Sequence, residues 1–172
     1  MITVCAAMRD MHDDITTTRL LLRPATVSEA ERIVNQHPDS TDSWAEDFPF
    51  EGDVIGATMF LRATQAGGDQ QPFGLYVIER GSDGQAVGAI GFKGQPQDGT
   101  VEIGYGLVPS ARGSGFAAEA ATALVDLARQ HGLARVVANT AKDNTASQRT
   151  LEHAGMTRIG VEGEEYVYEV AL

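Results

Sequence analysis

The chain has 172 residues, 42% of them hydrophobic, and carries 24 Asp and Glu against 13 Lys and Arg, a net charge of −11. This length is typical of one domain with a sizeable core. The negative charge excludes a nucleic-acid or anionic-membrane partner unless a local basic patch exists, and the sequence has none. No segment approaches the roughly 20 apolar residues of a membrane span, and the start lacks the basic lead of a secretory signal. Because Cys5 is the only cysteine, no disulfide can form within the chain, and we expect a cytoplasmic protein.

The N-terminal half contains one predicted strand and two predicted helices. Residues 1–14 show little periodicity and are expected to form a flexible tail, which leaves 15–172 as a single domain. A short apolar run at 18–24 that ends in proline indicates a strand. Helical patterns follow at about 26–37 and 54–65.

The C-terminal half begins with a predicted hairpin. Its strands, 73–79 and 86–92, are separated by RGSDG, which is a turn signal. The remaining elements are expected, in chain order, as a strand at 100–108, a helix that ends near residue 130, a strand at 135–140, a helix at 144–154 and a strand pair within 156–172. This order predicts one mixed α/β layer structure without repeats.

Residues 112–120, RGSGFAAEA, place two glycines and an arginine before an alanine-rich helix. The start of a helix exposes unpaired amides at the positive end of its dipole, and the missing Cβ atoms let a phosphate group approach closely. Arg112 would add a charge-assisted hydrogen bond. The stretch predicts a phosphate or pyrophosphate site; the alternative is a glycine turn that caps the helix and binds nothing.

The same stretch also satisfies G-x-G-x-x-A, a pattern found in dinucleotide-binding proteins. In that fold the first glycine follows its strand almost directly, and an acidic residue stands about 20 residues further on, at the end of the next strand. Here PSAR intervenes, the next strand ends in NTAKD, and a whole hairpin precedes the motif. A nicotinamide oxidoreductase is therefore only a remote alternative.

Five segments resemble the Gcn-related N-acetyltransferase (GNAT) superfamily in the order that this family has them. RGSGFA fits R/Q-x-x-G-x-G/A, the family's acyl-CoA signature. TTRLLLRP is similar to its first strand, VGAIGF to its third, VEIGY to its fourth and NTASQRTLEHAGM to its N-x-x-S helix with the closing glycine. The first strand and EIGY are most similar to the ribosomal-protein alanine acetyltransferase (Rim-type) branch. Together the matches cover roughly residues 16–172.

This resemblance implies an α/β (α+β) fold with a central, mixed, mostly antiparallel twisted sheet of six to seven strands and about four helices. It also implies acetyl-CoA as acyl donor, a primary amine as acceptor, and direct transfer in a ternary complex. The acceptor, a protein N-terminus or a small amine, stays open, because Gly106 and Arg112 stand where Rim-type relatives often carry aromatic residues. The family often forms homodimers. A non-catalytic acyl-CoA sensor or accessory protein on the same fold is the alternative.

Glu102 is the candidate general base, acting directly or through a water. Period-two alternation puts it on one face of its strand with Gly104, Gly106 and Val108, while apolar residues occupy the other face. Two glycines on one strand face indicate either a bulge or a close approach by another extended molecule, for which pantetheine is our candidate. The resemblance implies that pantetheine pairs with the end of this strand, near Leu107 and Val108. The resemblance places the family's base at Glu102. The alternative is a structural carboxylate that bonds loop amides.

Ser147 is the candidate general acid. Asn144, Ser147, Leu151 and Ala154 form one helical stripe whose polar N-terminal end should face a polar group. The resemblance implies that Asn144 orients pantetheine and that Ser147 serves the leaving thiolate; the alternative is an N-cap and a first-turn residue. The residues expected to bind the cofactor are Leu107, Val108, Arg112, Gly113, Ser114, Gly115, Phe116, Ala117, Ala118 and Asn144.

The acidic stretch 39–53 holds three aromatic residues, Trp44, Phe48 and Phe50. Its six carboxylates and these rings would suit a cationic amine and would shield the reacting centre from water. The favoured alternative is a solvated loop with aromatic anchors. The four histidines show no metal-ligand spacing, so no metal is expected.

Overall fold

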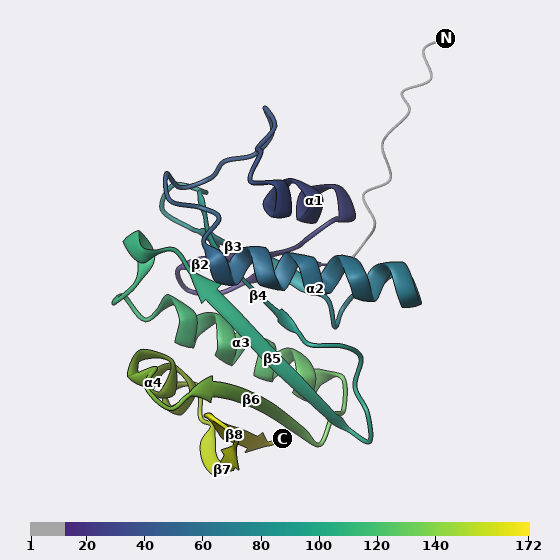
Figure 1. Ribbon diagram of the computed structural model, residues 1–172, viewed down its shortest axis with the longest axis vertical. Coiled ribbons are helices and arrows are strands. Elements are labelled where there is room, and N and C mark those ends of the chain that lie inside the picture. Colours follow the sequence, from purple (N-terminus) through teal and green to yellow (C-terminus); the bar gives the residue numbers. More distant parts are fainter. Residues whose placement is uncertain (1–12) are drawn as a thin grey trace.

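The computed structural model describes residues 13–172, which form one eight-stranded sheet with four α-helices packed on it (Figure 1). Cys5 and most of the expected 1–14 tail lie outside the described residues. The strands are β1 (Ile15–Thr16), β2 (Leu20–Pro24), β3 (Leu75–Arg80), β4 (Ala86–Phe92), β5 (Thr100–Leu107), β6 (Arg135–Ala141), β7 (Thr157–Glu162) and β8 (Glu165–Ala171). The helices are α1 (Val27–Asn35), α2 (Glu51–Gly67), α3 (Phe116–Gln130) and α4 (Thr145–His153), with a short 3-10 turn at Pro109–Ala111.

The sheet has the order β1-β2-β3-β4-β5-β6-β8-β7, and all neighbours are antiparallel except β5 and β6. This confirms the mixed, mostly antiparallel sheet. It has one strand more than expected, because the two-residue β1 pairs with β2 at one edge. Helix α2 begins at Glu51 instead of near residue 54, since the Asp53 carboxylate accepts the Phe50 N–H at 2.8 Å and caps the helix earlier.

The centre of the sheet is covered on both faces. All seven residues of β4 are buried, which explains its almost continuous apolar sequence. Neighbouring residues of β5 point to opposite faces. A Cβ on Gly106 would meet Gly52 of α2, whereas the Tyr105 hydroxyl contacts Ser147 of α4. Helix α2, with α1 packed against it, therefore covers one face, and α4, which contacts α3, lies on the other (Figure 1).

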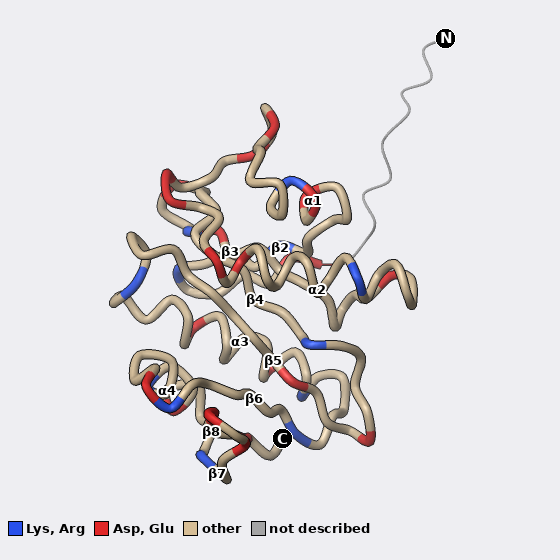
Figure 2. Tube along the Cα trace, viewed as in Figure 1, with Lys and Arg blue, Asp and Glu red and all other residues tan. Residues whose placement is uncertain are grey.

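The surface is predominantly acidic. Figure 2 shows carboxylates over the segment that joins α1 to α2 and around the β7–β8 end of the sheet. This distribution agrees with the net charge of −11. Among residues 13–172, no helix has both the length and the apolar character needed to cross a bilayer.

Candidate active site

The sheet opens between β5 and β6. These two strands pair only at Thr100, Val101 and Glu102. Beyond that point β5 continues beside β4 as far as Leu107, while β6 stays paired with β8 along its length. A wedge therefore separates the two strands, and its β5 side has no strand neighbour in the described part of the chain.

The edge of β5 that faces this wedge presents backbone groups. The Lys93 N–H donates to the Glu102 carbonyl at 2.8 Å, and the Val108 N–H donates to the Val87 carbonyl at 2.9 Å, so the even-numbered positions bond toward β4. Bonding directions alternate along an antiparallel strand. The amides and carbonyls of the odd-numbered residues within 103–107 therefore point into the wedge.

Val108, one of the residues expected to bind the cofactor, uses its amide within the sheet. Its amide cannot polarise a ligand carbonyl, because it is already bonded to Val87. The neighbouring Leu107 does direct its backbone toward the wedge, and its carbonyl accepts the Nε of Arg112 at 3.1 Å. The Leu107 amide is the group at this end of β5 that points toward the opening.

Gly104 and Gly106 let other parts of the protein approach β5 closely. A Cβ on Gly104 would stand 2.8 Å from Cε of Lys93, and a Cβ on Gly106 would stand 3.3 Å from the Cα of Gly52. Lys93 and the start of α2 therefore lie close to the strand face that these glycines clear. Gly104 also borders the cavity described next, so the close approach of pantetheine to this strand stays a prediction.

A cavity of about 440 Å³ lies at the opening. Helix α2 contributes Ile55 and Met59, whose side chains are 61% and 42% exposed, so the cavity reaches the surface along this helix. Lys93, Tyr105 and Ser147 supply polar groups to a lining that is otherwise largely apolar. A mostly apolar cavity with a few convergent polar groups is the usual form of a small-molecule site.

Glu102 forms an ion pair with Lys93, which lines this cavity. Its Oε1 accepts a hydrogen bond from Nζ of Lys93 at 2.9 Å, and both side chains are about one-third exposed, at 32% and 37%. Its carboxylate thus faces an ammonium group and not the loop amides of the alternative interpretation. Sequence reasoning missed Lys93, because only the register between β4 and β5 brings it beside Glu102.

Tyr105 and Ser147 meet across the wedge, from β5 and α4. Their hydroxyl oxygens are 2.7 Å apart, and the Tyr105 hydroxyl also donates to the Ser147 carbonyl at 3.2 Å. Burial raises the pKa of Tyr105, and its hydrogen bond with Ser147 opposes this. Asn144 is the N-cap of α4, and its Oδ1 accepts the Ser147 N–H at 3.1 Å. Like Lys93, Tyr105 is a polar residue of the candidate site that sequence reasoning did not select.

The glycine stretch forms an exposed loop that enters α3. Gly113 and Gly115 have φ values of 83° and 81°, a left-handed conformation that glycine adopts without a steric cost. Gly115 is the N-cap, and helical bonding begins with the Glu119 N–H to the Gly115 carbonyl at 3.1 Å. The amides of the first turn therefore have no acceptor within the helix and are available to an anion.

Arg19, which sequence reasoning also missed, braces this loop. Its guanidinium donates to the Ser114 carbonyl at 2.6 Å, pairs with Glu119 at 2.7 Å and lies over the Phe116 ring at 4.8 Å. Burial raises the pKa of Glu119, but the hydrogen bonds from Thr17 and Arg19 outweigh it, so the pKa is lowered. The wedge and this loop together have a form suited to an extended ligand that carries a phosphate group.

The three aromatic residues of the acidic stretch have separate positions. Phe48 is buried in the core, and Trp44 packs edge-on against it with ring centroids 5.1 Å apart. Phe50 is 39% exposed, and Arg112 lies over its ring at 5.1 Å. None of the three borders the cavity.

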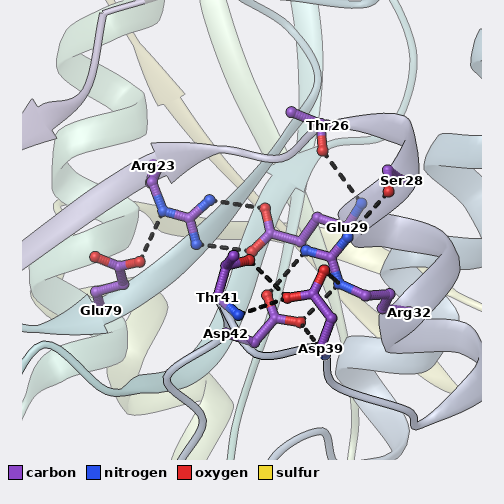
Figure 3. A network of polar contacts seen from close by, with 9 residues as sticks. All are labelled: Arg23, Thr26, Ser28, Glu29, Arg32, Asp39, Thr41, Asp42 and Glu79. Carbon is purple, nitrogen blue, oxygen red and sulfur yellow. Dashed lines mark hydrogen bonds and ion pairs between the residues drawn. The ribbon is translucent and has the colours of Figure 1, made fainter. Parts of the chain in front are cut away.

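Several carboxylates of the same stretch have partners inside the fold. Arg32 makes a two-pronged pair with Asp42, at 2.6 and 2.9 Å, and Asp47 accepts the Ser110 N–H and hydroxyl at 2.9 and 2.7 Å (Figure 3 shows the Arg32 cluster). Hydrogen bonding by Arg32 lowers the pKa of Asp42. These contacts agree with the favoured interpretation of an anchored, solvated loop.

Asp53 is expected to make stability depend on pH. It is fully buried, and burial raises its pKa to about 6, against the opposing effect of the Phe50 and Ala89 amides. Below its ordinary pKa of 3.8 the folded and unfolded states are both protonated. The folded state keeps the Asp53 proton up to a higher pH than the unfolded state does. The free energy of unfolding therefore falls by about 3 kcal/mol as the pH rises from 3.8 to about 6.

Asp53→Asn should remove this fall, which urea unfolding on both sides of the pH window would measure. Asp47→Asn is the matched control, because hydrogen bonds from Ser110 lower the pKa of Asp47 and its effect on stability has the opposite sign. An unchanged pH slope in Asp53→Asn would contradict the assignment.

A family model described as an acetyltransferase (GNAT) domain matches residues 19–157. The chain is 32% identical over 157 residues to the uncharacterized N-acetyltransferase YoaA of Bacillus subtilis (strain 168), a match that covers 89% of this chain and 87% of YoaA. It is 35% identical over 85 residues to YjdG, an uncharacterized N-acetyltransferase of the same organism, but this match covers 48% of the chain and 51% of YjdG. Among solved structures, RimL, a ribosomal L7/L12 alpha-N-protein acetyltransferase in complex with coenzyme A, aligns with a TM-score of 0.67 at 20% identity over 93% of this chain and 98% of RimL.

The chain therefore belongs to the GNAT acetyltransferase family. The family predicted from five short segments is confirmed, and the likeness to RimL shows the same fold. Membership in an acetyltransferase family replaces the nicotinamide oxidoreductase alternative.

Proposed function

We propose that this protein is an acyl-CoA-dependent N-acyltransferase that transfers an acetyl group to a primary amine by direct attack in a ternary complex. The observation that carries the proposal is the wedge between β5 and β6, with the amide-rich start of α3 beside it. The sheet edge supplies alternating donors and acceptors for the amides of pantetheine, and the loop supplies amides for the pyrophosphate. The reaction requires no metal.

The donor would extend from the loop at residues 112–118 along the edge of β5. Leu107 offers its amide to the pantetheine chain, and Arg112, held against Leu107 and Phe50, adds positive charge near the pyrophosphate. RimL was solved with coenzyme A, which supports the same class of ligand for this chain. Most of the rate enhancement would come from holding two substrates in reactive geometry.

The chemistry needs one group to accept a proton and one to donate a proton. Glu102 accepts the proton of the amine, directly or through a water, as the amine attacks the thioester carbon. Ser147, hydrogen-bonded to Tyr105, protonates the departing thiolate, with the proton supplied through the paired hydroxyls. An α-amine with a pKa near 8 needs little help at neutral pH, whereas a lysine-like amine near 10.4 depends on the base.

Acetyl-CoA binding is expected to raise the melting temperature. At about 100 times its Kd the ligand stabilises the folded state by about 2.7 kcal/mol, a rise of roughly 5 to 10 °C for a chain of this size. Gly115→Val should abolish this rise, because valine disfavours the φ of 81° and its Cβ would stand 3.4 Å from Arg19. Thermal unfolding with and without acetyl-CoA measures both effects.

Gly84→Val is the matched control. Gly84 has a φ of 71° with open space around it, in the turn between β3 and β4, so the backbone strain is similar but lies away from the loop. The control should lower the melting temperature and keep the ligand-induced rise. Loss of the rise in both variants, or its persistence in Gly115→Val, would contradict a binding role for the loop.

The alternative, an acyl-CoA sensor on the same fold, would also show the thermal shift. The two differ in turnover, because steady release of coenzyme A with an added amine excludes a pure sensor. A cytoplasmic location and a homodimer stay predictions from the sequence and the family.

A further inference from the structure

Lys93 brings an amine to the mouth of the candidate active site. It follows the last residue of β4, and its N–H bonds to the Glu102 carbonyl at 2.8 Å. Its side chain crosses Gly104, with Nζ 3.8 Å from the point where a Cβ on Gly104 would lie, and ends 2.9 Å from the Glu102 carboxylate. Lys93 borders the same cavity as Tyr105 and Ser147. The primary amine and the candidate acid thus line one cavity, and the candidate base is paired with that amine.

We propose that Lys93 is itself an acetyl acceptor, so that the protein acetylates its own active-site lysine when it holds acetyl-CoA without another amine. This inference rests on the proposed function. The Lys93 ammonium loses one proton to Glu102, which passes it to solvent, and the neutral amine attacks the thioester carbon. A C–N bond forms and the C–S bond breaks. The second nitrogen proton is lost as the amide forms, and the thiolate takes one through Ser147, so the products are acetyl-lysine, coenzyme A thiol and one proton.

The modification would change the site in two ways. The acetylated nitrogen carries no charge, so the ion pair with Glu102 is lost. The added acetyl group extends from a side chain that already crosses Gly104, so it narrows the cavity. Self-acetylation therefore slowly inhibits acetyl transfer to other amines.

Lys93 and Lys142 are the only two lysines of the chain, so acetylation of a lysine side chain can be assigned to one of two positions. Lys142 is exposed in the turn before α4 and reports purely chemical acetylation. The full-length protein would be incubated with acetyl-CoA alone and followed by intact mass and peptide mapping. We expect the mass of one acetyl group on Lys93, Lys142 unmodified over the same period, and a first-order rate that dilution of the protein does not change.

Three variants test which residues the modification depends on. Lys93→Arg keeps a positive partner for Glu102 and should remove the modification, whereas Lys142→Arg should leave it unchanged. Glu102→Gln should slow acetylation of Lys93 by about 100-fold. Heat-unfolded protein serves as the chemical background, in which the two lysines should react at equal rates.

Equal labelling of the two lysines in the folded protein, or a rate on Lys93 that rises with protein concentration, would overturn self-acetylation within one molecule. If acetyl-CoA raises the melting temperature and an added amine is acetylated while Lys93 stays unmodified, the proposed function stands and this inference falls. If acetyl-CoA neither binds nor reacts, both fall.

Discussion

Replacing Glu102 by glutamine is expected to lower kcat/KM for a lysine-like amine by about 10²- to 10⁴-fold, the range that a positioned general base contributes. Glutamine keeps the length and a hydrogen-bond acceptor for Lys93, but it cannot accept a proton at neutral pH. At pH 7 about one lysine amine in 2,500 is neutral, against roughly one α-amine in ten. The loss should therefore be much smaller for a peptide with a free α-amine and a blocked side chain.

The measurement is kcat/KM against pH for the two acceptor types, in the wild-type protein and in Glu102→Gln. In the variant, the rate with the lysine-like acceptor should rise with pH as the free amine becomes abundant. Glu162→Gln, on the exposed strand β7, is a matched control that removes one carboxylate far from the proposed chemistry along the sheet order. An equal loss with both acceptors, or an unchanged rate, would assign Glu102 a structural role.

Replacing Arg23 by methionine is expected to cost about 3 to 5 kcal/mol of unfolding free energy, the usual penalty for leaving a buried charge without its partner. Arg23, on β2, bonds both carboxylate oxygens of Glu29 in α1 at 2.7 and 2.8 Å, and its Nε bonds Glu79 of β3 at 2.7 Å (Figure 3). The Glu29 side chain is only 4% exposed. Its hydrogen bond with Glu29 is the main reason why the pKa of Arg23 is raised.

Urea unfolding of a double-mutant cycle would measure this cost. Arg23→Met with Glu29→Met should recover most of the loss, because the more deeply buried of the two carboxylates that Arg23 pairs with is then removed. Arg80→Met tests an exposed pair with Asp83 and should change stability by about 1 kcal/mol or less. A small effect of Arg23→Met alone would mean that water reaches Glu29 in the folded state.

Local sequence patterns predicted most of the helices and strands, because each pattern depends only on residues within its own element. The apolar run of β4, the RGSDG turn and the helix after residue 115 follow from periodicity and turn chemistry that act over a few residues. The start of α2 was misplaced, because Asp53 caps it from inside an acidic stretch that resembles a loop. The two-residue β1 has no signal of its own and depends on its pairing with β2.

The sequence could predict those parts of the candidate site that lie within one segment. It could not predict the contacts between segments that are distant in the chain. Gly113, Gly115 and the amides after them lie within a single loop and helix start, so the sequence alone could predict an anion site there. The contacts of Lys93 with Glu102, of Tyr105 with Ser147 and of Arg19 with the glycine loop join distant elements, and no local pattern reports them.

The family, the order of the elements and the glycine loop before α3 were all predictable from the amino-acid sequence, because they depend on neighbours along the chain. The use of each strand face was decided only in three dimensions. The sequence predicted a close approach at Gly104 and Gly106, but only the register of β4 and the packing of α2 bring Lys93 and Gly52 there. The early end of β5–β6 pairing leaves one edge of β5 open, since a strand's hydrogen-bonding partners are set by the whole sheet and not by its own residues.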